Sequence, residues 1–271
     1  MRKHWIWLLA LAVAASWVGN VWFYESQKVD KPIFLKHYYE MPESLLQHMR
    51  LYYLTNKDSS REPYQVELAD GIMLHVEHIE TRDEKGRLQL REAVLSPSSI
   101  AIGQLKEQLT VDQFRVYYND GFEDTVEIGK LIIHPDKQAL PLESNFTRGS
   151  SDGTGGDGYI ARRDIEITAV TNSYADLLGS GFELMLNNGS VKASDFSAFP
   201  IQLRKGDSFS MSYRFLLSKG DIRQFDVFQL MVVAEERNGN PAGVMFINKQ
   251  PDLYEKDLSK YVRLRKEEAL L

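Results

Sequence analysis

Two stretches of the sequence match patterns known from enzyme active sites. Gly149–Gly153 fits the G-x-S-x-G pattern of serine hydrolases, in which a sharp strand-to-helix turn exposes the serine. Gly153–Gly158 fits the G-x-G-x-x-G pattern of dinucleotide sites, where the N-terminus of a following helix meets the pyrophosphate. Here a predicted strand follows instead of a helix. A glycine-dense run matches both patterns by chance, so we predict no activity or cofactor from either.

Metal-ligating side chains also occur close together in two places. His75 and His78 form the one close histidine pair, with Glu77 between them. On a strand, positions 75 and 77 share a face while 78 points the opposite way, so the two imidazoles would not meet one metal. Asp152, Asp157 and Asp164 lie in and beside the glycine-rich run, with a spacing that matches no EF-hand loop. We therefore predict no metal site.

Catalytic residues cannot be assigned from the sequence. The chain has 38 acidic residues, which offer too many carboxylate pairs, and a glycosidase-type site needs two of them at a defined separation. It has no cysteine, which excludes disulfides, zinc–thiolate sites and cysteine nucleophiles. A hydrolase using paired carboxylates stays one hypothesis.

Three tyrosine doublets suggest a binding surface. On a strand, one ring of each doublet must face away from its neighbour, so one can serve the core while the other is exposed. Exposed rings aligned across strands would suit a sugar ring or a partner protein. The alternative is ordinary cross-strand packing of residues with high β propensity. The candidate ligand-binding residues are Tyr38, Tyr39, Tyr52, Tyr53, Tyr117 and Tyr118.

The charge balance limits the partners. The net charge is −6, and no cluster of Lys and Arg offsets the acidic residues. Binding to phosphate draws most of its affinity from clustered basic side chains. We therefore predict no nucleic-acid partner.

Alternating residues and turn signals predict the elements that position these side chains. Tyr64–Leu68 and Phe209–Phe215 alternate with period two, as expected for half-buried strands. Asn119-Asp120-Gly121 and Asn238-Gly239-Asn240 favour hairpin turns. Pro251–Leu270 carries apolar residues at helical spacing. The pattern predicts a mainly β chain with one or two antiparallel β-sandwich-like domains and a C-terminal helix.

The glycine-rich stretch 149–158 divides the predicted β region. It contains no apolar residue and cannot bury surface to offset its ordering entropy. We predict β-rich domains at 32–148 and 159–271, with 149–158 either a linker between them or a loop within one domain. Residues 25–31 form a polar spacer.

The N-terminal segment 1–24 predicts a membrane anchor. Arg2 and Lys3 precede a run from Trp5 to Tyr24 without charge, and about 20 such residues span about 30 Å, the thickness of a bilayer core. The basic flank predicts that the N-terminus lies in the cytoplasm. We therefore expect a single-pass signal-anchor protein of the cell membrane whose bulk is extracytoplasmic. The alternative is a signal peptide cleaved after Ala12-Val13-Ala14.

These features lead to three functional hypotheses. The first is a binding or interaction module for an envelope component, a protein or a glycan, or for a membrane partner. The second is the hydrolase with paired carboxylates. The third is an extracytoplasmic sensor or regulator that works through a membrane partner.

Overall fold

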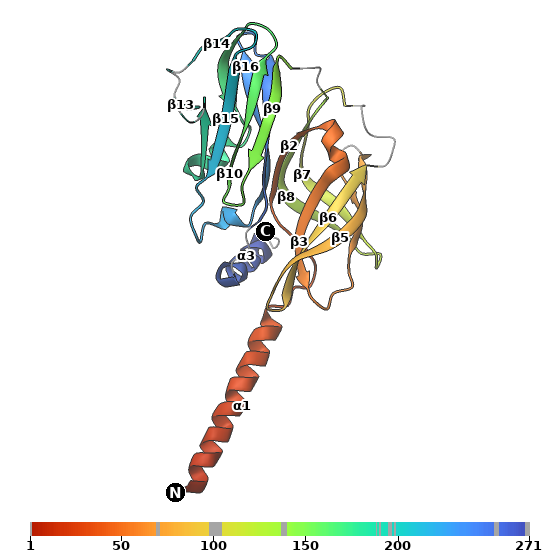
Figure 1. Cartoon of the computed structure of the whole chain (residues 1–271). Coiled ribbons are helices and arrows are strands. Elements are labelled where there is room, and N and C mark those ends of the chain that lie inside the picture. The colour runs from red at the N-terminus through yellow and green to blue at the C-terminus, as the bar shows by residue number, and fades with distance from the viewer. Residues whose placement is uncertain are drawn as a thin grey trace.

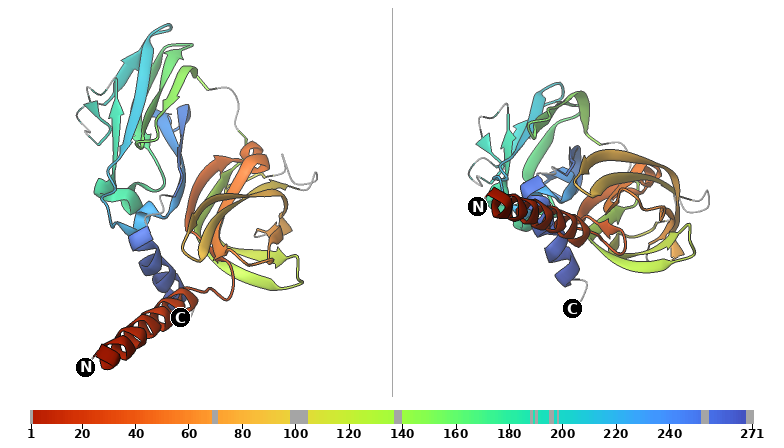
Figure 2. Two further views of the ribbon diagram at one scale, coloured as in Figure 1. Left: turned by 60° about the horizontal axis from the view of Figure 1, so that its bottom comes forward. Right: turned by 90° about the horizontal axis from the view of Figure 1, so that it is seen from below.

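Strands make up most of the described chain. The computed structural model describes residues 2–68, 71–97, 105–136, 140–187, 189, 191–194, 197, 199–251 and 255–268. Their strands form a 12-stranded sheet and a five-stranded sheet. Together they build two units, a barrel and a sandwich, which lie side by side above a projecting N-terminal helix (Figures 1 and 2).

The barrel is formed by the first part of the long sheet. Neighbouring strands of the barrel pair in the order β1-β3-β6-β5-β4-β7-β8-β2. The sheet curls until the segment from Ile33 to Pro42 lies between its two ends: β1 pairs with β3, and β2 pairs with β8. A 3-10 turn, Glu43–His48, joins β2 to β3. The strands are β1 Ile33–Phe34, β2 His37–Pro42, β3 Met49–Asn56, β4 Pro63–Glu67, β5 Met73–Lys85, β6 Leu88–Pro97, β7 Leu109–Tyr118 and β8 Glu123–His134.

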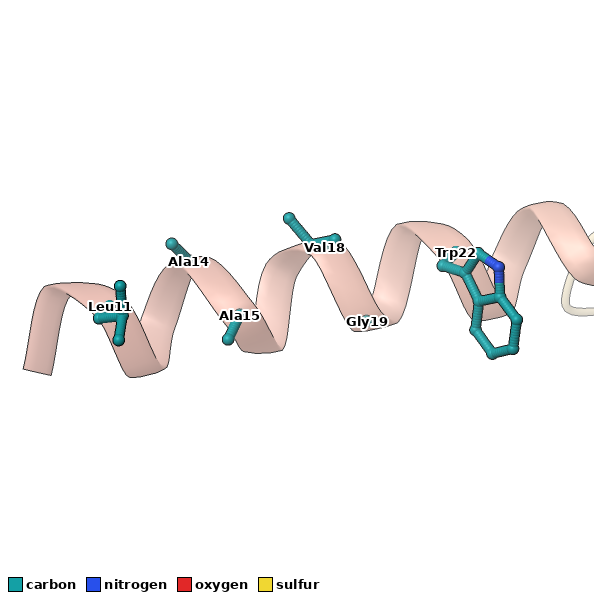
Figure 3. A pocket seen from close by; sticks show the side chains of 6 residues that line it. All are labelled: Leu11, Ala14, Ala15, Val18, Gly19 and Trp22. Atoms are coloured by element: carbon teal, nitrogen blue, oxygen red, sulfur yellow. The ribbon is translucent and has the colours of Figure 1, made fainter. Parts of the chain in front are cut away.

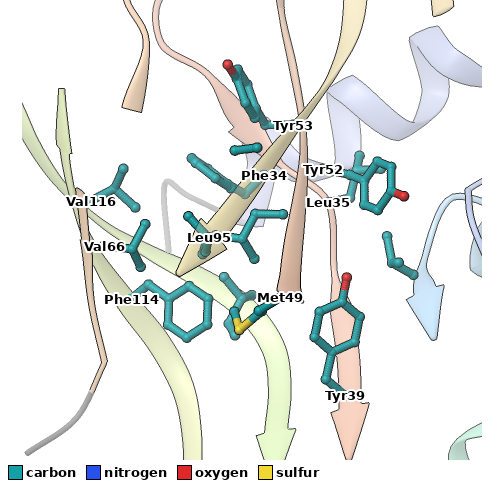
Figure 4. Packing of buried hydrophobic residues seen from close by; sticks show 14 of the residues in the cluster. Phe34, Leu35, Tyr39, Met49, Tyr52, Tyr53, Val66, Leu95, Phe114 and Val116 are labelled. Atoms are coloured by element: carbon teal, nitrogen blue, oxygen red, sulfur yellow. The ribbon is translucent and has the colours of Figure 1, made fainter. Parts of the chain in front are cut away.

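Side chains fill the barrel. Phe34, Met49, Tyr53, Leu95 and Phe114 are buried and meet in its interior (Figure 4). They come from strands far apart in the sequence, so closing the sheet brings them together. Burying such aliphatic and aromatic groups is the main stabilising term for this unit.

The sandwich uses the rest of the long sheet and all of the short one. The short sheet has the order β13-β12-β15-β10-β9, and β14, β11, β16 and β17 of the long sheet cover it. Tyr159, Phe209 and Leu230 are among the buried residues of its core. The strands are β9 Leu142–Gly149, β10 Thr154–Ala161, β11 Ile165–Thr171, β12 Phe182–Leu186, β13 Val191–Lys192, β14 Ile201–Leu203, β15 Ser208–Phe215, β16 Val227–Glu236 and β17 Pro241–Lys249, with short helical turns at α2 Ala175–Leu178, Gly179–Gly181 and Ile222–Gln224.

The two units share strand β2. It pairs in parallel with β8 of the barrel and with β16 of the sandwich. The prediction of purely antiparallel sheets is therefore wrong, and the long sheet is mixed. Hairpin signals report only neighbours along the chain, whereas β2 and β16 lie at opposite ends of the sequence.

The glycine-rich stretch lies inside the sandwich. Gly149 ends β9, residues 150–153 turn, and Thr154–Gly158 belong to β10. A Cβ on Gly156 would lie 2.6 Å from the carbonyl oxygen of Met211 on β15, so the absence of side chains permits close strand packing.

The N-terminal segment forms helix α1, Arg2–Ser26, which extends away from both units (Figure 1). No helix in the described part of the chain is both long and apolar enough to cross a membrane. The predicted transmembrane anchor at 1–24 is therefore wrong. Ser16, Gly19 and Asn20 interrupt the apolar run, and tryptophan and tyrosine suit interfaces better than a bilayer core. The location outside the cytoplasm stays a prediction.

The predicted C-terminal helix is present as α3, Glu255–Glu268. It does not join the sandwich that precedes it but returns to the barrel, where Leu258, Tyr261 and Val262 are buried in the core cluster. The ring of Tyr261 stacks on Phe225, with centroids 4.8 Å apart. This packing holds α3 beside the barrel near the base of α1 (Figure 2).

Candidate functional site

The tyrosine doublets do not form an exposed aromatic strip. Tyr39, Tyr52, Tyr53 and Tyr118 are buried, and Tyr38 and Tyr117 are half-buried. They serve different parts of the structure. Tyr39 donates a hydrogen bond to the carbonyl of Arg50 (2.6 Å), Tyr117 donates one to Glu67 (2.8 Å), and Tyr38 stacks on Phe228. Burial raises the pKa of Tyr52, Tyr53 and Tyr118 above the ordinary tyrosine value.

The other sequence candidates stay apart as well. His75 and His78 are exposed on β5, and His78 lies 3.4 Å from Glu80. No group of three ligating side chains suited to a metal occurs within the described ranges. The hydrolase and dinucleotide patterns fall on a strand hairpin, with no helix after them. Neither pattern therefore has the local structure that its chemistry needs.

A buried carboxylate joins a serine and a histidine where the two units meet. Glu40 on β2 lies 2.9 Å from Nε2 of His134 on β8, and it accepts a hydrogen bond from Oγ of Ser173 (2.8 Å). In a catalytic triad the histidine lies between serine and acid. Here the carboxylate of Glu40 lies between the serine and the histidine, and Ser173 and His134 both contact it. The cluster thus connects barrel strands to the loop before α2.

A second buried carboxylate, Glu92, lies on the barrel wall. Arg50 and Arg82 bind its two oxygens at 3.0 and 2.5 Å. Arg82 also binds Glu80, which lies with it on β5, the strand beside that of Glu92. Burial acts to raise the pKa of Glu92, but bonds from Arg82 and Tyr52 and the charge of Arg50 outweigh it and lower that pKa. A general acid needs the opposite shift. The pair of carboxylates that Arg82 joins, Glu80 and Glu92, therefore does not support glycosidase chemistry.

Two buried titratable groups flank the contact between β2 and β16. Burial raises the pKa of Asp226 to about 7, against the charges of Lys249, Lys36 and Arg265. Burial lowers the pKa of His37 to about 3, and its Nε2 accepts a hydrogen bond from the backbone N–H of Tyr52 (2.9 Å). Both groups are enclosed, so their shifted values describe packing at this contact rather than an accessible catalytic site.

A groove of 590 Å³ opens between the barrel and α3. Its walls are the segment from Val29 to Phe34, Gln113 of β7, residues 124–127 of β8, and Arg265 and Lys266 of α3. The lining is mainly apolar with charged groups at the rim. A concave, mostly apolar site with a few polar groups is the usual form of a binding site.

The groove exists because the barrel seam is incompletely closed. The segment containing β1 and β2 pairs with β8 only from His37 onward, opposite Gly129. The β7–β8 register shifts at this point, and Gly129 has a φ of 97°. A bulge of this kind bends a strand and increases its twist. The residues of β8 before Gly129 therefore have no ladder pairing with β1.

Side chains bridge the open part of the seam. Nη2 of Arg265 donates to the carbonyl of Phe34 (3.3 Å) on one wall and to that of Glu127 (2.9 Å) on the other. Lys31 forms an ion pair with Asp124 across the same space (2.6 Å). The bonds from Arg265 satisfy backbone oxygens that a neighbouring strand would otherwise meet.

A second hollow lies along α1 and is lined by Leu11, Ala14, Ala15, Val18, Gly19 and Trp22. All six belong to helix α1, which projects away from the barrel and the sandwich (Figures 1 and 3). Because nothing closes this hollow, it has less of the form of a site than the groove.

Comparisons with known proteins do not identify the site. No family model and no curated protein matches the sequence. The chain is similar to a protein of unknown function from Porphyromonas gingivalis W83, at 9% identity and a TM-score of 0.24 over 82% of this chain and 99% of that one. It is also similar to the sialic acid binding region of a Streptococcus Sanguinis SK1 adhesin, at 12% identity and a TM-score of 0.20 over 83% of this chain and 78% of that one. Scores this low establish neither a shared fold nor a shared ligand.

Proposed function

We propose that this protein is a binding module, and that its ligand occupies the groove between the barrel and α3. The observation that carries the proposal is the open barrel seam, a 590 Å³ space walled by β1, β8 and α3. The floor is provided by Val29, which is buried, and by half-buried Ile33 and Val126. Burying apolar ligand surface there would supply affinity, and the charged rim would supply specificity.

The hydrolase hypothesis has less support. Of the buried carboxylates, Glu40 and Glu92 are held by donors, and the raised pKa of Asp226 belongs to an enclosed group that is 6% exposed. A catalytic acid must reach its substrate within hydrogen-bond distance. The sensor hypothesis depended on a membrane partner, and no contact in the structure favours it over simple binding.

The proposal is tested by placing a photoreactive phenylalanine analogue at Thr125, an exposed residue of the groove wall, and at Glu77, an exposed residue of β5. Cells expressing each protein are irradiated and the adducts compared. We expect adducts at position 125 that are absent at position 77. The substitution Gln113→Trp, which fills the groove from β7, should abolish them, whereas Glu77→Trp should not. Equal labelling at both positions would contradict a role for the groove.

A further inference from the structure

Helix α1 has no packed face. Every α1 side chain whose burial the structure describes is exposed, including those of Trp7, Leu11 and Trp22. A helix held by packing would bury an apolar stripe against a neighbouring element. The direction in which α1 leaves the barrel (Figure 1) is therefore set by contacts at its C-terminal end.

One enclosed side chain, that of Arg87, meets this end of α1. Arg87 lies in the turn between β5 and β6 and is 7% exposed. Its Nη1 binds the carboxylate of Glu25 in the last turn of α1, and its Nη2 binds Asp58 in the loop between β3 and β4 (3.2 Å). The guanidinium also lies 5.1 Å from the ring centroid of Tyr24. We call the contact of Arg87 with Glu25, Asp58 and Tyr24 the latch.

The residues that follow α1 lead directly into the groove wall. Val29 exchanges two hydrogen bonds with Asn56 at the end of β3: its backbone N–H donates to Oδ1 (3.0 Å), and Nδ2 donates to its carbonyl (2.6 Å). The carbonyl of Lys28 accepts a bond from Lys266 of α3 (3.0 Å). Val29 and Lys266 both line the groove. Residues 26–28 alone separate Glu25 from this wall, so little chain is available to absorb a movement of the helix.

We propose that the latch couples α1 to the groove. While Arg87 holds Glu25, the wall at 29–34 keeps its shape, and a partner or a load on α1 that withdraws Glu25 frees the wall. This inference rests on the groove being the binding site, and it assigns that site a regulation. The coupling is reciprocal, because a ligand that fits the held wall must also favour the closed latch.

The composition of the latch suits a contact that opens and closes. Glu25 and Asp58 are exposed, so water can solvate their charges when the contact opens. When Glu25 leaves, Arg87 keeps Asp58, so the enclosed guanidinium is not left without an ion pair. The planar guanidinium binds both carboxylates at once and fixes their positions more closely than a lysine ammonium would. The latch therefore opens without leaving a buried charge unpaired, yet selects one direction of α1 when closed.

The direction of α1 is measured by double electron–electron resonance between two spin labels. The chain has no cysteine, so Val13→Cys on α1 and Glu77→Cys on β5, both at exposed positions, carry the only labels. We expect a narrow distance distribution in the chain that has no further change. Arg87→Met, which keeps an aliphatic stem without the charge, should widen that distribution at least about twofold. Arg115→Met, which removes an exposed ion pair with Glu67, is the matched control and should leave the width unchanged.

The state of the groove wall is measured by amide hydrogen exchange in the same variants without labels. The N–H of Val29 is bonded to the buried side chain of Asn56, so its exchange requires that bond to open. We expect Arg87→Met to speed this exchange at least about tenfold and Arg115→Met to leave it unchanged. Glu25→Gln alters only an exposed side chain of α1 and should speed the exchange by less, because an amide still accepts a hydrogen bond. Circular dichroism checks that each variant is folded.

The outcomes separate this inference from the proposed function. Equal distance distributions with and without Arg87→Met would overturn the latch. A wider distribution with unchanged exchange at Val29 would also overturn it, because α1 would then be released without effect on the groove. The proposed function is judged by the adduct at position 125. Absence of that adduct, together with a wider distribution and faster exchange, would overturn the groove as a binding site while the link between α1 and the wall stands.

Discussion

The barrel seam has a closed half and an open half, formed by one continuous segment. The segment pairs with β8 from His37 to Pro42, and from His37 to Tyr39 it also pairs with β16 on its other side. At Ile33–Phe34 it has β3 on one side and the groove on the other. The closed half buries His37, Glu40 and the nearby Asp226. The open half relies on side chains, Arg265 and Lys31, to bridge its walls.

This difference shows where the protein can change partners at low cost. Ladder hydrogen bonds in the closed half are enclosed, and breaking them would leave buried polar groups unsatisfied. In the open half, Arg265 and Lys31 lie at a surface and can exchange their partners for water or a ligand. The seam therefore combines a rigid attachment with an adaptable site.

The largest expected effect comes from Gly129, where the halves meet. Gly129→Val places a Cβ 2.8 Å from the carbonyl oxygen of His37, at a φ of 97° that a β-branched residue avoids. We expect a loss of stability of about 4 kcal/mol in urea unfolding. Gly121→Ala, at a φ of 80° in an open turn with nothing within 4 Å, is the control and should cost about 1 kcal/mol. Equal losses would show that the close approach to His37 is unimportant.

Asp226 should give the next largest effect, with a defined pH dependence. Its folded pKa of about 7 lies above the unfolded value, so the native state binds the extra proton and stability falls as pH rises from about 4 to 7. Asp226→Asn removes the cost of ionising a buried group. We expect little change at pH 4 and a gain of about 4 kcal/mol at pH 8. Unfolding curves at the two pH values check this, and a pH-independent difference would contradict it.

His37 should give the opposite pH dependence of stability. Its folded pKa of about 3 lies below the unfolded value of 6.5, so stability is present above pH 6.5 and is lost as pH falls toward 3. Between pH 7.5 and 4.5 the loss from this residue should be about 3 kcal/mol. His37→Gln cannot be protonated, so its stability should fall by that much less over the same range. Parallel pH profiles for wild type and variant would refute the assignment.

Arg265 belongs to the open half and should give the smallest effect on stability. Arg265→Met retains the aliphatic stem but removes the donors to Phe34 and Glu127. Water can replace them, so we expect a loss of about 1 kcal/mol or less in urea unfolding. A loss as large as that of Gly129→Val would show that this half is as rigid as the closed one.

Local patterns in the sequence predicted much of the strand content. Phe209–Phe215 lies in β15, the Asn119-Asp120-Gly121 turn joins β7 to β8, and Leu258, Tyr261 and Val262 form the buried face of α3. Each of these signals depends on neighbouring residues, through strand alternation, turn conformation or helical spacing.

The site could not be predicted in the same way, because it depends on contacts distant in the sequence. Tyr52 and Tyr53 point to opposite faces of β3, yet both are buried: Tyr53 lies in the barrel, and Tyr52 lies near His37 and Glu92. The rule that one ring of a doublet is exposed fails where both faces of a sheet are covered. Gly129, a glycine in the interior of β8, was a local signal of a bulge and hence of the groove.

The shared strand β2 also affects how the chain acquires its structure during synthesis. His37 pairs with Val227, so an N-terminal strand must keep one edge without its partner until most of the polypeptide has left the ribosome. Contacts between such distant residues slow folding, and an exposed edge invites pairing with other chains in the meantime. We therefore expect the joining of barrel and sandwich to be the late, slow step of folding, and the stage at which newly made chains are most exposed to aggregation.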